Sequence, residues 1–482
     1  GSNPELNYID CGGTSNISPS MAVVDNKVHI VWESNAGDQR SIYHCIAEKS
    51  GYTKPQQISA KGYNSYNPDI VAFENGNVFA AWDSIRNMSG DIFGRMMKKG
   101  KWQPERKITS DVRIERHPNL CVKDNNIWMC WQAHSYDKFY NEYFKNLENL
   151  RLNTYSEQII AVARITDDEL LAPKGLFKTV SGRPKVRPQI DFGPDGSLYL
   201  SARESVAEQA SWVPVIWKYN SNGWSEKQIL CDQQGRWRGA VITQTKDGIT
   251  IAYEKDNIAN HWKQRGDYPA WNKQLETRNI SAISGNEKVE LEKLRMPKVV
   301  FSLERKINLC GAELPRQKSK IGNEELTLFW GDLHNHTDIS VCQRASNPPG
   351  HDLFANERDI EKLDFCAVTD HAYNLDKFIW KYHREQVRFN HDPGKFLTFL
   401  GQEWTSNSNP PAKKGMPDRY GHHNIIYLDD HDKFYDAYDG DITPADIWKL
   451  LHGVEYIFIP HQIADNSGFN PPKDWSFVDE KI

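Results

Sequence analysis

Histidines are concentrated near the end of this chain, in five short motifs that also contain carboxylates. Eleven of the 16 histidines lie after residue 330 of the 482. The motifs are GDLHNHT with His334 and His336, VTDH with Asp370 and His371, GQEW with Glu403, GHHN with His422 and His423, and PHQ with His461. Imidazole and carboxylate together suit Zn, Mn or Fe rather than Ca. The residue types therefore predict a transition-metal site.

The spacing of the first two histidines suits a shared ion. In an extended strand, residues i and i+2 point to the same face, so His334 and His336 can both reach one metal. A carboxylate such as Glu403 can bridge two ions. Two ions about 3.5–4 Å apart can activate a shared water and hold a phosphoryl oxygen. This combination predicts a hydrolytic metal centre.

Short apolar runs next to these motifs predict the strands that position them. From Leu326 onward the runs LTLFWGDL, LDFCAVTDH, FLTFLGQEW, HNIIYL and YIFIPHQ alternate with polar, helix-like stretches, and Thr443 followed by Pro444 is typical of a helix start. This alternation predicts a parallel α/β sheet or barrel. Four of the five motifs fall at the C-terminal end of a predicted strand, where parallel α/β folds build their sites. We therefore expect the motifs to converge at one rim.

In content and order, GDLHNHTDIS, VTDH, GQEW, GHHN and PHQ resemble the PHP superfamily of metal-dependent phosphoesterases (polymerase and histidinol phosphatase). The FWGDLHNHT opening is most similar to a branch whose PHP domains occur in larger chains. The resemblance covers about Leu326 to His461, roughly a third of the chain. It implies a distorted (βα)7 barrel and a phosphoesterase that uses two or three divalent transition metals, Zn, Mn or Fe.

Carried over by position, the resemblance also implies a set of ligands and catalytic residues. The implied metal ligands are His334, His336, His371, Glu403, His422 and His461. Within this set Glu403 would bridge two ions, and His423 stays open as the alternative to His422. The implied catalytic residues are Glu403, Asp370 and His371, with Asp370 either orienting His371 or acting as a ligand itself.

The sequence departs from the family pattern after His461. Family members have a late Asp-x-His pair, whereas here Asp465, Asp474 and Asp479 follow without another histidine. We therefore expect a barrel that is short by two or three βα units, with either a C-terminal part missing or an incomplete metal site.

The first half of the chain contains a repeat of about 50 residues. Four of its units begin at Pro19, Pro68, Pro118 and Pro188, and a fifth begins at Arg238. Each unit predicts a strand, a tight Asn/Asp/Gly turn and a second strand. Such a period, with four strands per unit, is typical of β-propeller blades. We predict an all-β propeller of about five blades, or six if residues 260–300 contribute.

The domain plan that follows is multidomain. We expect a propeller over residues 1–262, a connector over 263–325 and the PHP-type domain over 326–482. The opening segment LNYIDCGGTS is expected to complete the last blade and close the ring, which would remove exposed strand edges. Tryptophans recur at one phase of the repeat and are expected in the blade core, at Trp32, Trp82 and Trp131.

Composition and charge limit the classes of partner that this protein is expected to have. A net charge of −5 and a pI of about 6.4 argue against a nucleic-acid partner. The sequence contains no run of about 18 apolar residues, so it predicts no membrane span. The expected substrate is a phosphorylated small molecule or glycan, and the sequence defines no oligomeric state. The propeller and the 16 tryptophans favour an extracytoplasmic (periplasmic or secreted) protein. The alternative function is a non-catalytic propeller that binds a glycan or protein, with a degenerate PHP domain.

Several other polar residues of the last third are expected to lie at the surface and outside the site. Arg344 and Arg419 could hold a substrate phosphate, but surface positions are favoured for both. Five histidines in helix- or loop-like stretches are expected to be solvated: His351, His383, His391, His431 and His452.

Overall fold

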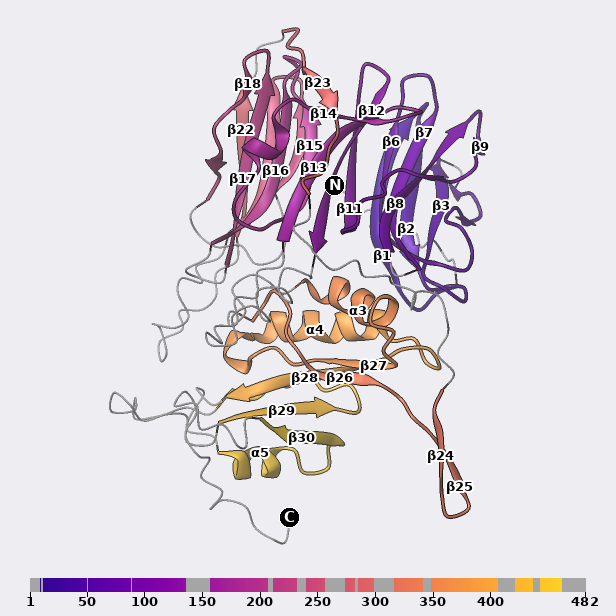
Figure 1. Ribbon diagram of the computed structural model, residues 1–482, viewed down its shortest axis with the longest axis vertical. Helices are drawn as coiled ribbons and strands as arrows, with labels where there is room; N and C mark the ends of the chain where they lie inside the picture. Colours follow the sequence, from indigo (N-terminus) through magenta and orange to yellow (C-terminus); the bar gives the residue numbers. More distant parts are fainter. Residues whose placement is uncertain are drawn as a thin grey trace, which may run out of the picture. The chain divides into compact units, whose positions relative to one another are not determined.

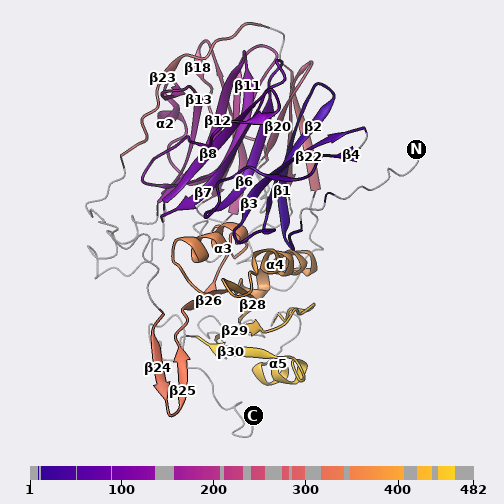
Figure 2. The same cartoon turned by 90° about the vertical axis from the view of Figure 1, so that its right-hand side faces the viewer.

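A computed structural model defines the fold of this chain. It describes residues 9, 12–49, 51–87, 89–135, 157–206, 211–231, 240–255, 274–281, 285–298, 316–340, 348–405, 421–436 and 443–461. The chain divides into two compact units (Figure 1, Figure 2). One comprises residues 1–259 with 271–312, and the other comprises residues 260–270 with 313–482.

The described residues of the first unit form five antiparallel sheets that follow one another along the chain (Figure 1). The first sheet contains β1 (Asn16–Val24), β2 (Lys27–Ser34), β3 (Ser41–Glu48), β4 (Gly51–Tyr52) and β5 (Gln56–Gln57). The second contains β6 (Asn64–Ala72), β7 (Val78–Arg86), β8 (Ser89–Lys98), β9 (Lys101–Trp102) and β10 (Arg106–Lys107). The third contains β11 (Ile114–Lys123), β12 (Asn126–Ser135), β13 (Glu157–Ile165), β14 (Leu170–Pro173) and β23 (Leu291–Lys293).

The remaining two sheets follow the short helix α2 (Leu176–Thr179). The fourth sheet contains β15 (Lys185–Phe192), β16 (Leu198–Val206), β17 (Ser211–Asn220), β18 (Gly223–Trp224) and β19 (Gln228–Ile229), and the fifth contains β20 (Val241–Thr245), β21 (Gly248–Lys255) and β22 (Gln274–Ser281). The first strands of successive sheets contact one another: β1 with β6, β6 with β11, β11 with β15 and β15 with β20. This five-bladed β-propeller arrangement confirms the predicted blade number.

The expected connector over residues 263–325 is wrong in part. Strand β22 pairs with β21 and completes the fifth sheet, and β23 pairs with β14 at the edge of the third. The described parts of this region, residues 274–281 and 285–298, therefore extend existing blades and form no sixth blade. In the segment LNYIDCGGTS, expected to close the ring, residues 6–8, 10 and 11 lie outside the described residues, and residues 12–15 lead into β1 of the first blade, where Ser15 and Asn35 are joined by two hydrogen bonds. Most of the insertion between the third and fourth repeats also lies outside the described residues.

The predicted tight turns and core tryptophans are confirmed. Asp25 and Asn26 both adopt positive φ (52° and 57°), as a two-residue hairpin turn requires. Trp32, Trp82 and Trp131 are at most 6% exposed. Apolar clusters fill the interfaces between consecutive blades, so that each blade is stabilised mainly by its neighbours.

Hydrogen bonds between the blades recur at equivalent positions of the sequence repeat. Asp69 on β6 accepts hydrogen bonds from Ser20 of the preceding blade (2.6 Å), and from Asn119 (2.9 Å) and the Leu120 backbone (2.7 Å) of the following one. In turn, Asn119 accepts from the Ile190 backbone N–H of the fourth blade (2.9 Å). The same strand position thus serves as the acceptor in successive blades.

A β-bulge that recurs in the first strand of four blades supplies a second set of hydrogen bonds between blades. Ser18, Asn67, His117 and Arg187 stand before the repeat prolines with φ between 48° and 55°, each at a register shift in the first strand of its blade. At His117 this conformation turns the backbone N–H to Asp83 of the preceding blade (3.0 Å). At Arg187 it turns the N–H to Gln132 (3.0 Å). The left-handed backbone is therefore explained by hydrogen bonds between blades.

The second unit is an α/β layer. It contains a hairpin of β24 (Lys318–Ile321) and β25 (Glu324–Thr327), and then a sheet of β26 (Gly331–Asn335), β27 (Phe365–Val368), β28 (Leu397–Thr405), β29 (His422–Tyr427) and β30 (Tyr456–Pro460) in that spatial order. Its helices are α3 (Gly350–Asp359), α4 (Lys377–Asn390), α5 (Pro444–Leu450) and the 3₁₀ turn η2 (Ala372–Asn374). Helix α5 starts at the predicted cap, where Thr443 and Asp446 form a capping box.

The sheet differs from the expected parallel barrel. Strands β26, β27 and β28 are parallel, whereas β29 is antiparallel to β28 and β30 is antiparallel to β29. The described residues form a five-stranded mixed sheet, and within them β26 does not pair with β30. Helices α3 and α4 lie along one side of this sheet (Figure 1), where α3 packs on β27 and α4 on β28. None of the described helices is long and apolar enough to span a membrane.

We predict that Asp69→Ala destabilises the propeller on the order of 3 kcal/mol, because it leaves buried donors of two other blades without their acceptor. Glu48→Ala is the control, since Glu48 is exposed and pairs only at the surface with Lys27, so its loss should cost under about 1 kcal/mol. Denaturant unfolding followed by tryptophan fluorescence measures both. Equal costs for the two variants would contradict the role of Asp69.

Candidate metal centre

The five motifs meet at one end of the mixed sheet. Because β26, β27 and β28 are parallel, their C-terminal ends share that rim. Strand β29 runs the other way and begins there with His422. Strand β30 turns back again, so that His461 follows its last residue at the same rim. The strand directions thus bring together residues that lie more than 100 positions apart.

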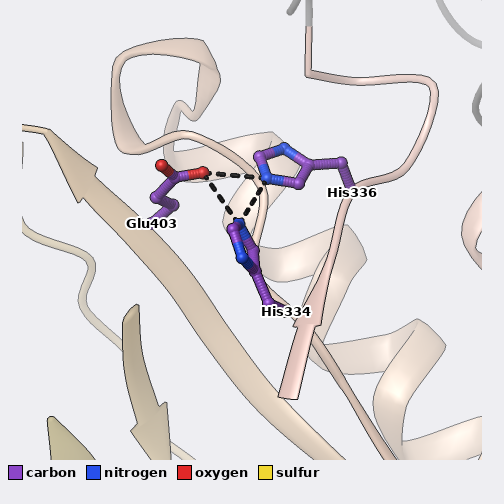
Figure 3. A group of neighbouring side chains, drawn as sticks. All are labelled: His334, His336 and Glu403. Carbon is purple, nitrogen blue, oxygen red and sulfur yellow. Dashed lines mark hydrogen bonds and ion pairs between the residues drawn. The ribbon is translucent and has the colours of Figure 1, made fainter. Parts of the chain in front are cut away.

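Glu403 lies at the centre of these residues and is 3% exposed. It stands on β28, on the face opposite Thr398, whose hydroxyl donates to the Val387 carbonyl of α4 (2.7 Å). Its Oε2 is 2.8 Å from His336 Nε2 and 3.4 Å from His334 Nε2. Figure 3 shows both imidazoles turned toward the carboxylate.

A second group of imidazoles surrounds the same carboxylate. His371 Nδ1 is 3.3 Å from Glu403 Oε2. His422 Nδ1 contacts Oε1, and His461 Nδ1 lies 3.5 Å from Oε1. Two sets of three therefore have ligand atoms within 4.8 Å of one another: His334, His336 and Glu403, and His371, Glu403 and His422. The structure thus places all six expected ligands in one cluster.

Backbone hydrogen bonds extend the sheet to the cluster and limit its freedom. The Glu403 N–H donates to the Asp370 carbonyl (3.0 Å), and the His461 N–H donates to the His422 carbonyl (2.9 Å). Strand register therefore sets the positions of Glu403 and His461.

Asp370 has a different place from the expected one. Its carboxylate accepts hydrogen bonds from the Thr337 N–H (2.7 Å) and hydroxyl (2.6 Å), and His383 Nε2 lies 3.1 Å from Oδ2. Burial disfavours the charged carboxylate, but these partners outweigh it and hold the pKa of Asp370 below its usual range. Asp370 therefore anchors the residue after His336, and its described contacts are not with His371.

The choice between His422 and His423 follows from the alternation of β29. His422 faces Glu403, whereas His423 points to the other side of the strand. There its ring packs against Trp404 and Phe458, at centroid distances of 5.6 Å and 4.8 Å. The geometry thus favours His422 as the ligand.

Three polar residues that the sequence pattern did not single out hold the imidazoles. Ser340 Oγ is 2.8 Å from His336 Nδ1 and accepts from the His371 N–H (3.0 Å). The hydroxyl of Thr405 lies near Nδ1 of His371 (3.3 Å) and of His422 (3.4 Å). Asn424 Oδ1 lies 2.8 Å from His461 Nε2. Thr405 and Asn424 are each two residues from a cluster member in a strand, and this spacing could have identified them.

The protonation of the cluster suits metal binding. Burial lowers the pKa of His371 to about 3, with Glu403 acting in the opposite direction. Burial alone would raise the pKa of Glu403, but the surrounding imidazoles hold it well below its ordinary value. A charged carboxylate next to a neutral imidazole is the state that binds a divalent ion.

Two of the histidines expected to be solvated are buried. His383 is 2% exposed and faces Asp370, and His351 is 7% exposed with its Nδ1 3.2 Å from Asn390 Oδ1. His391 and His431 are half-buried, and His452 is exposed. Arg344, Arg419, Asp465, Asp474 and Asp479 lie outside the described residues.

No family model matches this sequence, and no curated protein matches it. Solved structures that resemble the chain include a protein of unknown function from Dyadobacter fermentans DSM 18053, with a TM-score of 0.39 and 10% identity over 60% of this chain and 85% of that one. Another is an endo-arabinase from Bacteroides thetaiotaomicron VPI-5482, with a TM-score of 0.32 and 14% identity over 58% of this chain and 100% of that one.

A third is a family 117 glycoside hydrolase of the marine bacterium Zobellia galactanivorans, with a TM-score of 0.33 and 10% identity over 53% of this chain and 83% of that one. These TM-scores are all below 0.5. The likeness therefore assigns no activity to this chain, and none of these three proteins is described as having a PHP domain.

We predict that Asp370→Ala lowers the free energy of unfolding of the α/β unit by about 3 kcal/mol or more, because it leaves Thr337 and His383 without their buried acceptor. Since the pKa of Asp370 is lowered in the folded state, its contribution is present above the unfolded-state value of about 3.9 and is lost as the pH falls below it. Hydrogen exchange of β27 and α4 under denaturant measures the effect. Unchanged exchange together with loss of bound metal would instead make Asp370 a ligand.

Proposed function

We propose that the α/β unit is a metal-dependent hydrolase site whose substrate class is phosphate esters. One observation carries the proposal: five imidazoles, four at the ends of β26, β29 and β30 and one in the loop after β27, surround a single buried carboxylate at one rim of the sheet. The resemblance of the five motifs to PHP phosphoesterases supports the choice of substrate.

The donor set fits divalent transition metals. His334 Nε2 and His336 Nε2 are 3.1 Å apart and both lie near one carboxylate oxygen. Converging lone pairs of neutral imidazoles repel one another unless a proton or a cation lies between them, and imidazole with carboxylate is the ligand set of Zn, Mn or Fe. The fit is therefore chemical as well as geometric.

The residues divide into two groups around the bridging carboxylate. His334 and His336 would hold one ion with Oε2 of Glu403. His422 and His461 would hold a second with Oε1, and His371 lies on the side of Oε2. When bound, such a pair of ions supplies Lewis-acid activation of water and neutralises charge that develops on a phosphoryl group. Exposure of 44% at His334 leaves this side of the cluster open to substrate.

We predict that purified protein holds about two transition metals per chain, and that His334→Ala or His336→Ala lowers metal-dependent phosphoesterase turnover by at least about 100-fold. Loss of a direct ligand should cost more than the 10–100-fold typical of outer-shell partners. Elemental analysis and a panel of phosphomonoesters and phosphodiesters, before and after chelation and re-addition of Mn²⁺ or Zn²⁺, give the measurement.

His452→Ala is the matched control, because His452 is an exposed histidine of the same unit, and it should keep both metal and activity. Unchanged turnover of metal-verified His336→Ala protein would rule out the assignment. A wild-type protein that holds less than one metal per chain, with no restoration by added Mn²⁺ or Zn²⁺, would also reject it.

The second candidate function lies in the propeller, as a glycan-binding or glycan-hydrolysing module. Its support is the five-bladed arrangement, in which the first strands of successive blades pack side by side. Solved structures with glycan-active names resemble the chain, but their TM-scores are too low to carry the argument. The repeat tryptophans Trp32, Trp82 and Trp131 are buried and do not offer a stacking surface for sugars.

If the propeller is a recognition module, we predict that the full chain still binds glycans after its metals have been removed. A panel of plant and algal polysaccharides in affinity electrophoresis tests this. Retardation that is unchanged in His334→Ala would place recognition outside the metal cluster. An absence of retardation with every polysaccharide would remove the support for this candidate.

A further inference from the structure

Asn424 occupies a special position between the first and last motifs. It stands on β29 directly opposite Glu403 in the register and is 2% exposed. Its Nδ2 donates to the Leu333 carbonyl on β26 (3.1 Å), and its Oδ1 lies 2.8 Å from His461 Nε2, just after β30. β26 and β30 are the two outer strands of the sheet, so one side chain joins both edges at the site.

These two contacts fix the orientation of the amide. A carboxamide nitrogen only donates hydrogen bonds and its oxygen only accepts them. If the amide were flipped, its oxygen would face the Leu333 carbonyl, which is also an acceptor. The Leu333 carbonyl therefore places Oδ1 toward His461, and His461 must carry its proton on Nε2.

The tautomer of His461 has a consequence for its other nitrogen. With the proton on Nε2, Nδ1 keeps its lone pair, and this atom lies 3.5 Å from Glu403 Oε1. The rings of His461 and His334 are also close, with centroids 4.1 Å apart, so a small rotation of His461 would bring it against its neighbour. The ring must be held for its lone pair to face the carboxylate.

We infer that Asn424 is a positioning residue, which selects the Nδ1 lone pair of His461 for an ion on the Oε1 side of Glu403. The inference rests on the proposed metal site. It also makes the cluster asymmetric, because His334 and His336 present Nε2 on the Oε2 side. Loss of Asn424 should therefore weaken the binding of one ion and leave the binding of the other unchanged.

The chain offers a matched control in Asn390. This residue is 0% exposed, its Oδ1 lies 3.2 Å from His351 Nδ1, and its Nδ2 donates to the Gln386 carbonyl (2.8 Å). Asn390 thus makes the same two kinds of contact, one to a backbone carbonyl and one to a histidine that is not in the cluster. Asn390→Ala reports the general cost of deleting a buried asparagine in this unit.

The first experiment is calorimetric titration of the metal-free full chain with Mn²⁺, with the protein's bound metal checked by elemental analysis. We expect Asn424→Ala to weaken one of two binding steps by about 10–100-fold, as loss of an outer-shell partner does. The other step, which is lost in His334→Ala, should be unchanged. Asn424→Asp keeps an oxygen acceptor for His461 but turns its second oxygen to the Leu333 carbonyl, so it should restore only part of the affinity, whereas Asn390→Ala should alter neither step.

The second experiment does not depend on metal. Nitrogen-15 NMR of histidine-labelled, metal-free protein reports which ring nitrogen of His461 is protonated, with the His461→Gln variant used to assign its signals. We expect a protonated Nε2 in the wild type and in Asn390→Ala, and a mixture of tautomers in Asn424→Ala.

The outcomes separate this inference from the proposed function. A protein that binds no Mn²⁺ but shows the expected tautomer would reject the metal site and keep the orienting role of Asn424. The inference would be overturned if the Asn424→Ala and Asn390→Ala variants bound both ions with the same affinities as each other. An Nδ1-protonated His461 in the wild type would also overturn it.

Discussion

The burial of one charged carboxylate is the constraint on which the α/β unit depends. Glu403 is 3% exposed inside a sheet, and an isolated buried carboxylate costs several kcal/mol. The cost is offset here by imidazoles that can donate to it, or that can hold a cation against it. Those imidazoles come from four separate motifs of the sequence. Strand order, strand direction and register together bring the five rings to one side chain.

Strand direction is the feature that completes this arrangement and that the sequence pattern could not supply. Four apolar runs correctly predicted β27 to β30, whereas the first run, LTLFWGDL, is divided between β25 and β26. A run of alternating residues reads the same for either direction of pairing. The expected parallel sheet was therefore wrong for β29 and β30. The reversal explains why His422 can stand at the start of its strand and still share a rim with residues at the ends of the others.

Local pattern was sufficient where the interaction is local, and insufficient where it joins distant segments. The positive-φ turn at Asp25 and Asn26, the cap at Thr443 and the buried tryptophans depend on neighbours in sequence or on strand alternation. The partners of Asp370 and Asn424 do not: Thr337 is 33 positions from Asp370, and Leu333 is 91 positions from Asn424. Their roles require the tertiary structure, and the same is true of the burial of His383 and of the blade strands found in the expected connector.

The buried carboxylates of the two units differ in the chemistry of their partners. In the propeller, Asp83 accepts from Asn67, from the Arg116 guanidinium and from the His117 backbone. The groups that donate here are an amide NH₂, a guanidinium and a backbone N–H, and their nitrogens offer no lone pair to a metal ion. Glu403 is surrounded instead by imidazoles, each of which can exchange its proton for a metal ion. Within the described residues, burial of charge stabilises blade packing in one unit and prepares a ligand set in the other. This difference in donor chemistry, and not burial itself, is the reason to propose a metal site in the α/β unit.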